Sequence, residues 1–207
     1  MSILTTSVLL VLSPDMVPVH YNLAGTIDRI GSKYEYLIFP VEAIAIGAFF
    51  GWMAKKHRQN PTDEKALVIC GICSLAVMEF LGICFQTAAI LYDPASAGGL
   101  RLKVMRLSVM AIGAMLVILG NIMPKARRNT YMGLRTAWSL SSDTIWQKSQ
   151  RFGGITGVIC GVLMILLAAF FDGIPCLVMS TVLILLWGIV SVGMSYKFYR
   201  EEQKKIQ

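Results

Sequence analysis

The pattern of apolar and polar positions divides the chain into long apolar runs separated by short polar segments. Five runs cover residues 34–54, 66–91, 104–123, 155–171 and 176–196. Each approaches or exceeds the roughly 20 apolar residues that a helix needs to cross a bilayer. The last two runs are joined by Asp172-Gly173-Ile174-Pro175, which is typical of a tight turn. The pattern therefore predicts an all-α integral membrane protein.

An earlier apolar run, residues 3–12, has only about half the length of a complete span. We interpret it as a short first span. The expected fold is thus a bundle of five to six transmembrane helices.

Cations are concentrated in alternate loops, which predicts the topology. Residues 55–65, residues 124–154 and the tail after residue 196 are rich in lysine and arginine, whereas the other loops carry two cations at most. The positive-inside rule places the rich segments, and with them the C-terminus, in the cytoplasm. Residues 13–33 are then expected to form an external loop.

Composition agrees with a lipid environment. Of the 207 residues, 56% are hydrophobic and 15% are charged, against about a quarter charged in ordinary soluble domains. The net charge of +7 is spread over several loops, so we predict no direct binding of nucleic acid. Cys70-x-x-Cys73 resembles half of a zinc or redox site, but no second pair accompanies it. The sequence contains no recognisable catalytic arrangement, and we predict no cofactor, no metal and no enzymatic activity.

Three ionisable side chains fall within predicted spans, namely Glu42, Glu79 and Arg106. A charged group at the centre of a bilayer costs about 3 kcal/mol on insertion scales, so such residues face protein or water. A pair between Arg106 and either glutamate would reduce that cost. Two interpretations stay open: the three residues hold the bundle together, or they line a pathway for protons or a small substrate.

The predicted external loop contains proline and glycine at positions that favour extended backbone and turns. Its candidate residues are Pro18, His20, Asn22, Gly25, Asp28 and Lys33. A metal site at His20 with Asp15 or Asp28 would have too few ligands. We therefore predict an ordered loop in which His20 has a structural or interfacial role.

The segment of residues 133–154, GLRTAWSLSSDTIWQKSQRFGG, is polar and aromatic and lies between two apolar runs. Tryptophan is typical of the membrane interface. Ser141 is a candidate N-cap with Asp143 in the first turn of a helix. The pattern predicts a short cytoplasmic amphipathic helix over residues 142–151, after which Gly153 and Gly154 turn the chain into the next span.

This segment resembles the SdpI family of bacterial membrane proteins, whose members show G-[IL]-R-T-[PK]-W-[TS]-L followed by W-x-K-[TGA]-x-[RK]. Ala137 stands where the family usually has proline, and Thr144 stands where it often has glutamate. The external segment, with PVHYN at residues 18–22 and GSK at residues 31–33, is similar to the domain of unknown function that often precedes this family. The signature residues carried over are Gly133, Arg135, Thr136, Trp138, Leu140, Ser141, Trp146, Lys148, Arg151 and Gly153.

The resemblance implies two regions: a membrane segment over residues 1–54 with the external loop 13–33, and an SdpI-like membrane domain over residues 55–207 with the cytoplasmic loop 124–154. It further implies a multi-pass protein of the bacterial cytoplasmic membrane that gives immunity to a secreted killing-factor peptide. The implied partners are that peptide toxin, membrane lipids and a cytoplasmic helix-turn-helix repressor. The alternative is a small proton- or ion-coupled transporter using the three intramembrane charges.

Overall fold

The computed structural model describes residues 2–22, 26–91 and 104–206. Gly25 of the predicted external loop lies outside these residues. The described chain contains six α-helices and one two-stranded sheet. The elements are α1 (Ser2–Leu12), β1 (Met16–Tyr21), β2 (Ile27–Ser32), η1 (Lys33–Leu37), α2 (Ile38–Lys56), α3 (Pro61–Ile90), α4 (Val104–Ile122), η2 (Met123–Lys125), α5 (Asp143–Phe170) and α6 (Gly173–Ile206).

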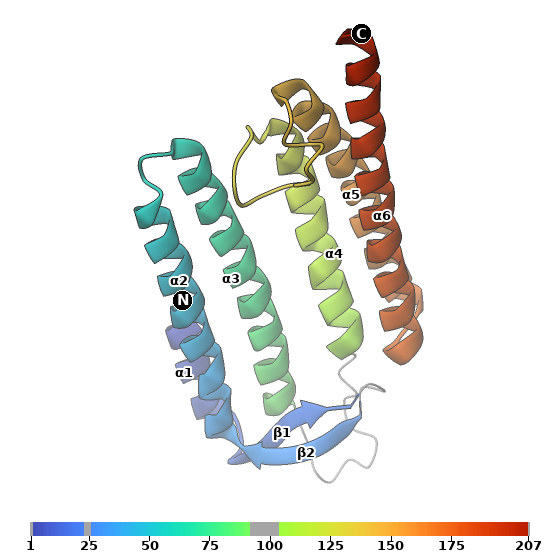
Figure 1. The fold of residues 1–207 in the computed structure, drawn as a ribbon. Helices are drawn as coiled ribbons and strands as arrows, with labels where there is room; N and C mark the ends of the chain where they lie inside the picture. The colour runs from blue at the N-terminus through green and yellow to red at the C-terminus, as the bar shows by residue number, and fades with distance from the viewer. Residues whose placement is uncertain (1, 23–25, 92–103, 207) are drawn as a thin grey trace.

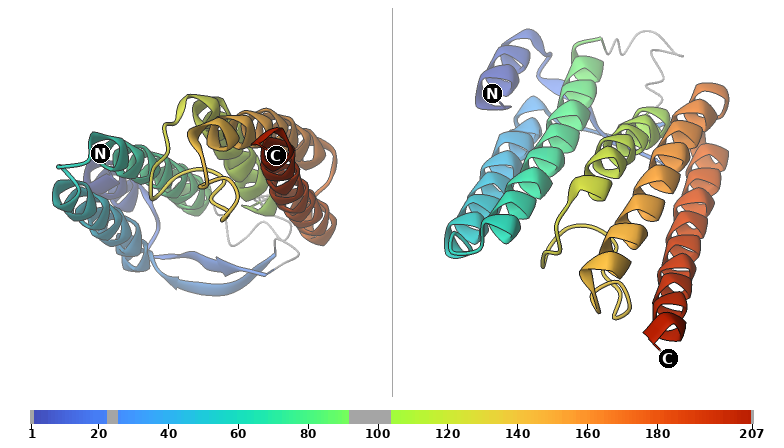
Figure 2. Two further views of the ribbon diagram at one scale, coloured as in Figure 1. Left: turned by 45° about the horizontal axis from the view of Figure 1, so that its top comes forward. Right: turned by 90° about the horizontal axis from the view of Figure 1, so that it is seen from above.

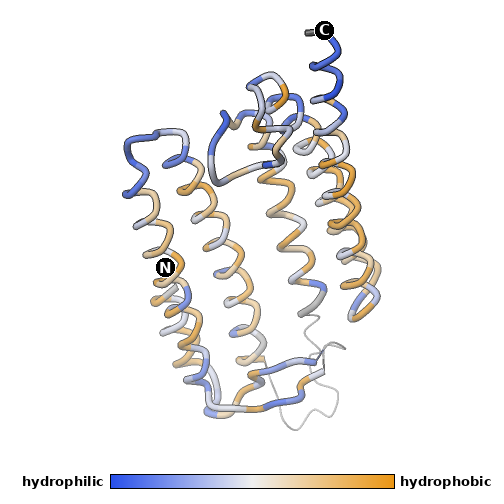
Figure 3. The backbone as a smooth tube through the Cα atoms, in the orientation of Figure 1, coloured by the Kyte–Doolittle hydropathy of each residue, from blue (hydrophilic) through white to orange (hydrophobic). Residues whose placement is uncertain are grey.

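Five of the helices are long and apolar enough to cross a membrane, as the sequence predicts. They are α2 to α6, and their apolar stretches lie side by side between two polar ends (Figures 1 and 3). The N-terminal helix α1 has 11 residues, which corresponds to about 16 Å of helix and about half a bilayer. It packs against α3 and α2 without crossing the whole layer by itself.

The bundle consists of two groups of helices. The first comprises α1, α2 and α3, and the second comprises α4, α5 and α6 (Figure 2). The contact between the two groups runs mainly through α3 and α4 and is sparse compared with the packing inside each group. The predicted boundary at residue 54 falls in the last turn of α2 and stays a prediction.

Helices α4 and α5 pack unusually closely because glycines face each other at two levels. A Cβ atom built on Gly161 would lie 2.5 Å from the carbonyl oxygen of Gly113, and one built on Gly154 would lie 2.5 Å from that of Gly120. The two glycines are seven residues apart on each helix. Only residues without a side chain let the backbones approach to this distance.

The predicted short amphipathic helix is not a separate element. Helix α5 begins at Asp143 and continues without interruption to Phe170, so Gly153 and Gly154 lie inside it and do not turn the chain. Its N-cap is Ser142, whose side chain accepts a hydrogen bond from the amide of Ile145, and not Ser141. The prediction was wrong because both glycines are packing positions: Gly154 faces Gly120, and Gly153 lies beside Met123.

The predicted external loop folds as an antiparallel hairpin of β1 and β2, at the end of the bundle opposite the C-terminus (Figure 1). The all-α prediction therefore holds for the bundle but not for residues 16–21 and 27–32. The pairing is irregular after Pro18, which has no amide hydrogen to donate to a partner strand. Val17 and Pro18 are buried against the ends of the helices.

Candidate functional site: the polar segment and its basic cleft

The chain between η2 and α5 forms a compact loop at the end of the bundle that also carries the C-terminus (Figure 1). Asn129, which is 6% exposed, organises its first half. Its Oδ1 accepts hydrogen bonds from the amides of Tyr131 and Met132, at 2.9 and 2.7 Å. Its Nδ2 donates to the carbonyl oxygens of Arg127 and Met132. One side chain thereby replaces the hydrogen bonds that regular secondary structure would supply.

The loop is attached to the first group of helices through the start of α3. The buried carboxylate of Asp63 accepts hydrogen bonds from the backbone amide and the hydroxyl of Thr130, at 2.7 and 3.0 Å. The Tyr131 hydroxyl lies 2.7 Å from Nε2 of His57, which follows α2. These contacts link the two groups of helices at this end.

Gln150 attaches the second half of the loop to α5. This side chain is fully buried, and its amide group bonds both backbone groups of Leu134: Oε1 accepts from the Leu134 amide and Nε2 donates to the Leu134 carbonyl, each at 2.9 Å. The preceding Gly133 has a φ of 99°, a conformation that favours glycine. A Cβ atom at Gly133 would also overlap with Oε1 of Gln150.

Helix α6 holds the next part of the signature. The Thr136 hydroxyl lies 2.8 Å from that of Ser195, and the Trp138 ring lies 5.0 Å from the ring of Tyr196 between centroids. Ser139 closes a turn by donating from its hydroxyl to the Leu134 carbonyl. Arg135, by contrast, is exposed and has no hydrogen-bonded or ion-paired partner among the residues that the structure describes.

Trp146 lies inside the protein, although its predicted place was the membrane interface. Its side chain is 1% exposed, and its indole N–H donates to the Ala126 carbonyl at 2.8 Å. The indole nitrogen is therefore satisfied by the backbone of the loop and not by water. Trp146 fixes the start of α5 against the end of η2.

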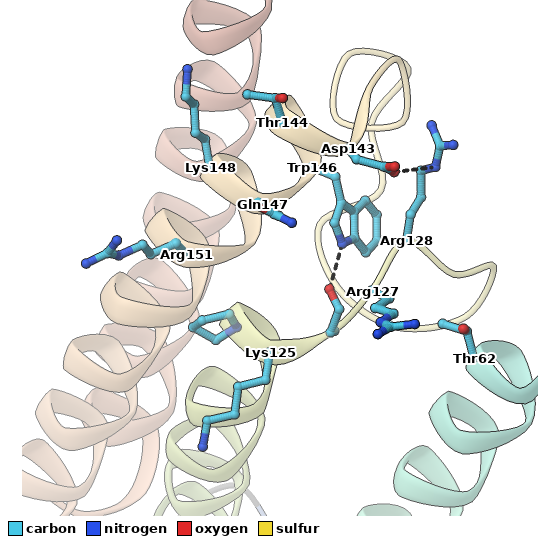
Figure 4. Close-up of a pocket in the computed structure, with 12 residues that line it drawn as sticks. Thr62, Lys125, Arg127, Arg128, Asp143, Thr144, Trp146, Gln147, Lys148 and Arg151 are labelled. Carbon is cyan, nitrogen blue, oxygen red and sulfur yellow. Dashed lines mark hydrogen bonds and ion pairs between the residues drawn. The ribbon is translucent and has the colours of Figure 1, made fainter.

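A cleft of about 790 Å³ opens beside Trp146 (Figure 4). We call it the basic cleft. Its charged lining residues are five cations and one carboxylate: Lys125, Arg127, Arg128, Lys148, Arg151 and Asp143. Lys148 and Arg151 extend from α5, Arg127 and Arg128 lie along the loop on the other side, and Lys125 lies below them.

Two of these cations are neutralised. Nε of Arg128 lies 3.2 Å from the Asp143 carboxylate, and Nζ of Lys148 lies 3.5 Å from that of Glu202 on α6. Lys125, Arg127 and Arg151 have no carboxylate partner in the described part of the chain. The basic cleft thus carries an excess of positive charge, which is chemically suited to binding an anion.

The structure brings Trp146, Lys148 and Arg151 together at the basic cleft but places the other signature residues elsewhere. Leu140 accepts a hydrogen bond from Arg128 on its carbonyl, and the Ser141 hydroxyl donates to the Trp138 carbonyl. Gly153 accepts the indole N–H of Trp187 on its carbonyl at 3.0 Å. Most of the signature residues therefore hold the loop in its fold and attach it to α5 and α6.

At the opposite end, the predicted loop residues build the hairpin. Nδ1 of His20 lies 2.6 Å from the Asp28 carboxylate across the two strands, and the Asn22 side chain accepts a hydrogen bond from the Thr26 amide. Nζ of Lys33 lies 3.0 Å from the Asp15 carboxylate. The Pro18 carbonyl accepts a hydrogen bond from the hydroxyl of Tyr36.

A second cleft, of about 580 Å³, lies between this hairpin and the helix ends. We call it the hairpin cleft. Its aromatic lining residues are Tyr21, Tyr36, Phe39 and Phe85, and its charged ones are Arg29 and Glu35, which form an ion pair at 2.8 Å. An apolar surface with a few polar groups is typical of a site for a small ligand or peptide side chain.

The three intramembrane charges do not form the predicted pairs. Oε1 of Glu79 accepts a hydrogen bond from Thr5 of α1 at 3.0 Å, and neither Glu42 nor Glu79 contacts Arg106 within the described residues. Nε of Arg106 is buried without a hydrogen-bond partner among the residues that the structure describes. The reason is topological: Arg106 is on α4, which packs mainly on α5, whereas both glutamates are in the other group of helices.

The fold and these sites define a multi-pass helical membrane protein with a folded polar segment at one end and a hairpin at the other. Residues 125–196 match the SdpI/YfhL protein family, and residues 1–44 match a domain of unknown function, DUF1648. These two matches, to the SdpI/YfhL family and to DUF1648 at the N-terminal end, confirm the resemblance seen in the sequence.

A curated relative is the immunity protein SdpI of Bacillus subtilis (strain 168). It is 25% identical over 201 residues, which cover 97% of this chain and 92% of the relative. No solved structure matches the chain. The similarity therefore extends over both clefts and all the described helices.

Proposed function

We propose that this chain is a bacterial immunity protein that protects the cell from a secreted killing-factor-type peptide, without catalysis. The observation that carries the proposal is the similarity to an immunity protein along nearly the whole chain. The match includes both the hairpin and the polar segment, so we assign both ends of the molecule to this one function, immunity. The protein is multi-pass, and we propose that its cation-rich end and C-terminus face the cytoplasm.

In this proposal the hairpin cleft meets the peptide. A membrane-active peptide carries apolar side chains and charged groups, and the hairpin cleft offers aromatic rings beside the Arg29–Glu35 pair. Aromatic side chains supply much of the binding energy at protein interfaces. The hairpin would then transmit peptide binding to the bundle through Tyr36, which bonds β1 from η1, just before α2.

The polar segment has the second role. Its exposed surface carries Arg135, which faces outward on a loop that is otherwise held by hydrogen bonds. We propose that this surface holds a cytoplasmic helix-turn-helix repressor at the membrane when the peptide is present. A rigid loop presenting an unpaired cation is suited to an acidic or hydrogen-bonding partner surface.

Expression of the full chain in a bacterium sensitive to the killing-factor peptide tests the proposal. We expect survival at peptide concentrations that kill cells carrying the empty vector. Arg135→Ala and Trp138→Ala are expected to abolish protection or signalling while the protein still inserts, since Arg135 is exposed and Trp138 is a half-buried ring outside the apolar spans that packs on Tyr196. Arg58→Ala, another exposed cation at the same end, is the matched control. Full protection by both variants at equal protein level would contradict the role of this surface.

Glu79→Gln separates immunity from the alternative of proton- or ion-coupled transport. A glutamine keeps an acceptor for the Thr5 hydroxyl, so the contact between α1 and α3 is retained. A transporter that moves protons through this carboxylate would lose its flux. We expect Glu79→Gln to protect cells as well as the unmodified chain does. Loss of protection, with normal insertion, would favour the transport reading.

A further inference from the structure

We propose that the basic cleft binds the phosphate of an anionic phospholipid, with one acyl chain lying along the groove between α3 and α4. The first observation is the unbalanced charge. Lys125, Arg127 and Arg151 line the basic cleft without a carboxylate partner in the ranges that the structure describes. Guanidinium and ammonium groups that line one cleft are suited to a phosphate group.

The second observation is the depth of the cleft. The apolar stretch of α4 and η2 runs from Arg106 to Lys125, and 20 helical residues match the thickness of the bilayer hydrocarbon. Lys125 therefore stands at the boundary between hydrocarbon and headgroups. Figure 4 shows its side chain directed along α4, away from the loop. A lipid phosphate at this level supplies a counter-charge where a soluble anion has little access.

The third observation is an adjoining apolar groove of about 550 Å³. It shares Thr62, Lys125, Ala126 and Arg127 with the basic cleft, so the two spaces adjoin. From there it passes between the two groups of helices along apolar side chains: Ala66, Ile69, Ile122 and Met132.

The groove exists because α3 and α4 pack only sparsely against each other. A groove with cations at its mouth and apolar walls below has the chemistry of a phospholipid, a charged head joined to a hydrocarbon chain. An acidic protein surface or free phosphate would satisfy the cations but leave the apolar walls unfilled.

Native mass spectrometry of the purified full chain, titrated with dioleoyl phosphatidylglycerol or dioleoyl phosphatidylcholine, tests the assignment. We expect preferential binding of phosphatidylglycerol. The double variant Lys125→Gln/Arg127→Gln is expected to weaken that binding by about thirty-fold, from the typical contribution of two cations near an anionic lipid. Lys55→Gln/Arg58→Gln removes the same two charges from exposed positions at the same end and is expected to bind like the unmodified chain.

A second pair of variants tests the acyl chain and separates a lipid from free phosphate. Ile69→Trp fills the groove, whereas Val68→Trp adds the same ring at the adjacent position, which is 45% exposed and does not line it. We expect only Ile69→Trp to weaken phosphatidylglycerol binding, and millimolar inorganic phosphate to displace none of it. Equal affinity for the two lipids would overturn the proposal and leave an acidic partner surface as the occupant. Displacement by phosphate, or equal effects within either variant pair, would overturn it as well.

Discussion

Replacing Gly161 by valine is expected to destabilise the bundle strongly. A Cβ atom at this position would lie 2.5 Å from the Gly113 carbonyl oxygen, a distance that real Cβ atoms do not adopt. The obstacle is backbone and cannot rotate away, so α4 and α5 must separate. Forcing extra atoms into a packed contact costs about 3 kcal/mol. The thermal midpoint of the detergent-purified protein should fall by about 6–12 °C.

Gly193→Val is the matched control for this prediction. Gly193 lies on α6, is exposed, and a Cβ atom there would meet no atom within 4 Å. Both substitutions add the same β-branched side chain to the interior of a long helix, so their intrinsic effects on helix formation are alike. A midpoint for Gly161→Val that matches the control would mean that α4 and α5 do not pack through these glycines.

The same glycines explain which part of the fold was predictable from the sequence. The five spans follow from run length and hydropathy, because in lipid each backbone group must be satisfied within its own helix. The packing role of Gly154 does not follow from run length or hydropathy. Beside Gly153 and after a polar stretch it indicates a turn, since glycine costs about 1 kcal/mol inside a helix. Its partner Gly120 is 34 residues earlier, and only the packed bundle reveals the contact.

The hairpin was missed for a different reason. Pro18 lies in the middle of β1, where proline argues against a strand, and the strands have only six residues each. What holds them is tertiary: Tyr36 bonds the Pro18 carbonyl, and Val17 is buried against neighbouring elements. Neither contact leaves a periodic signal in residues 13–33.

The sequence predicted where along the chain the candidate site lies, but not which residues hold it together. The signature identified Trp146, Lys148 and Arg151, which the structure brings to one cleft. It did not identify Asp63 and Gln150, which hold the loop. Asp63 follows Asn60-Pro61 in a helix start, where the helix dipole already accounts for an acidic residue. Gln150 stands between polar neighbours on a helix, and nothing in the pattern marks it as the one that is buried.

Gln150→Leu is expected to release the polar segment from α5. Leucine fills a similar volume but bonds neither backbone group of Leu134: both bonds are lost, and the Leu134 amide is left without a partner in a partly buried site, while the carbonyl keeps the Ser139 hydroxyl. That loss costs about 3 kcal/mol, so hydrogen exchange at the Leu134 amide should accelerate about a hundredfold while the apolar parts of α5 stay protected. Since the loop presents Arg135, protection of peptide-sensitive cells should be lost too.

Gln147→Leu makes the same chemical change one turn earlier on α5, where the side chain is exposed and no described residue bonds it. This variant should leave unchanged both the hydrogen-exchange rate of the Leu134 amide and the survival of peptide-treated cells. The two measurements separate the loop's fold from its function. Fast exchange with full survival in Gln150→Leu would mean that immunity does not depend on an ordered loop. Slow exchange in that variant would mean that other contacts hold the loop, foremost Asp63 with Thr130 and Thr136 with Ser195.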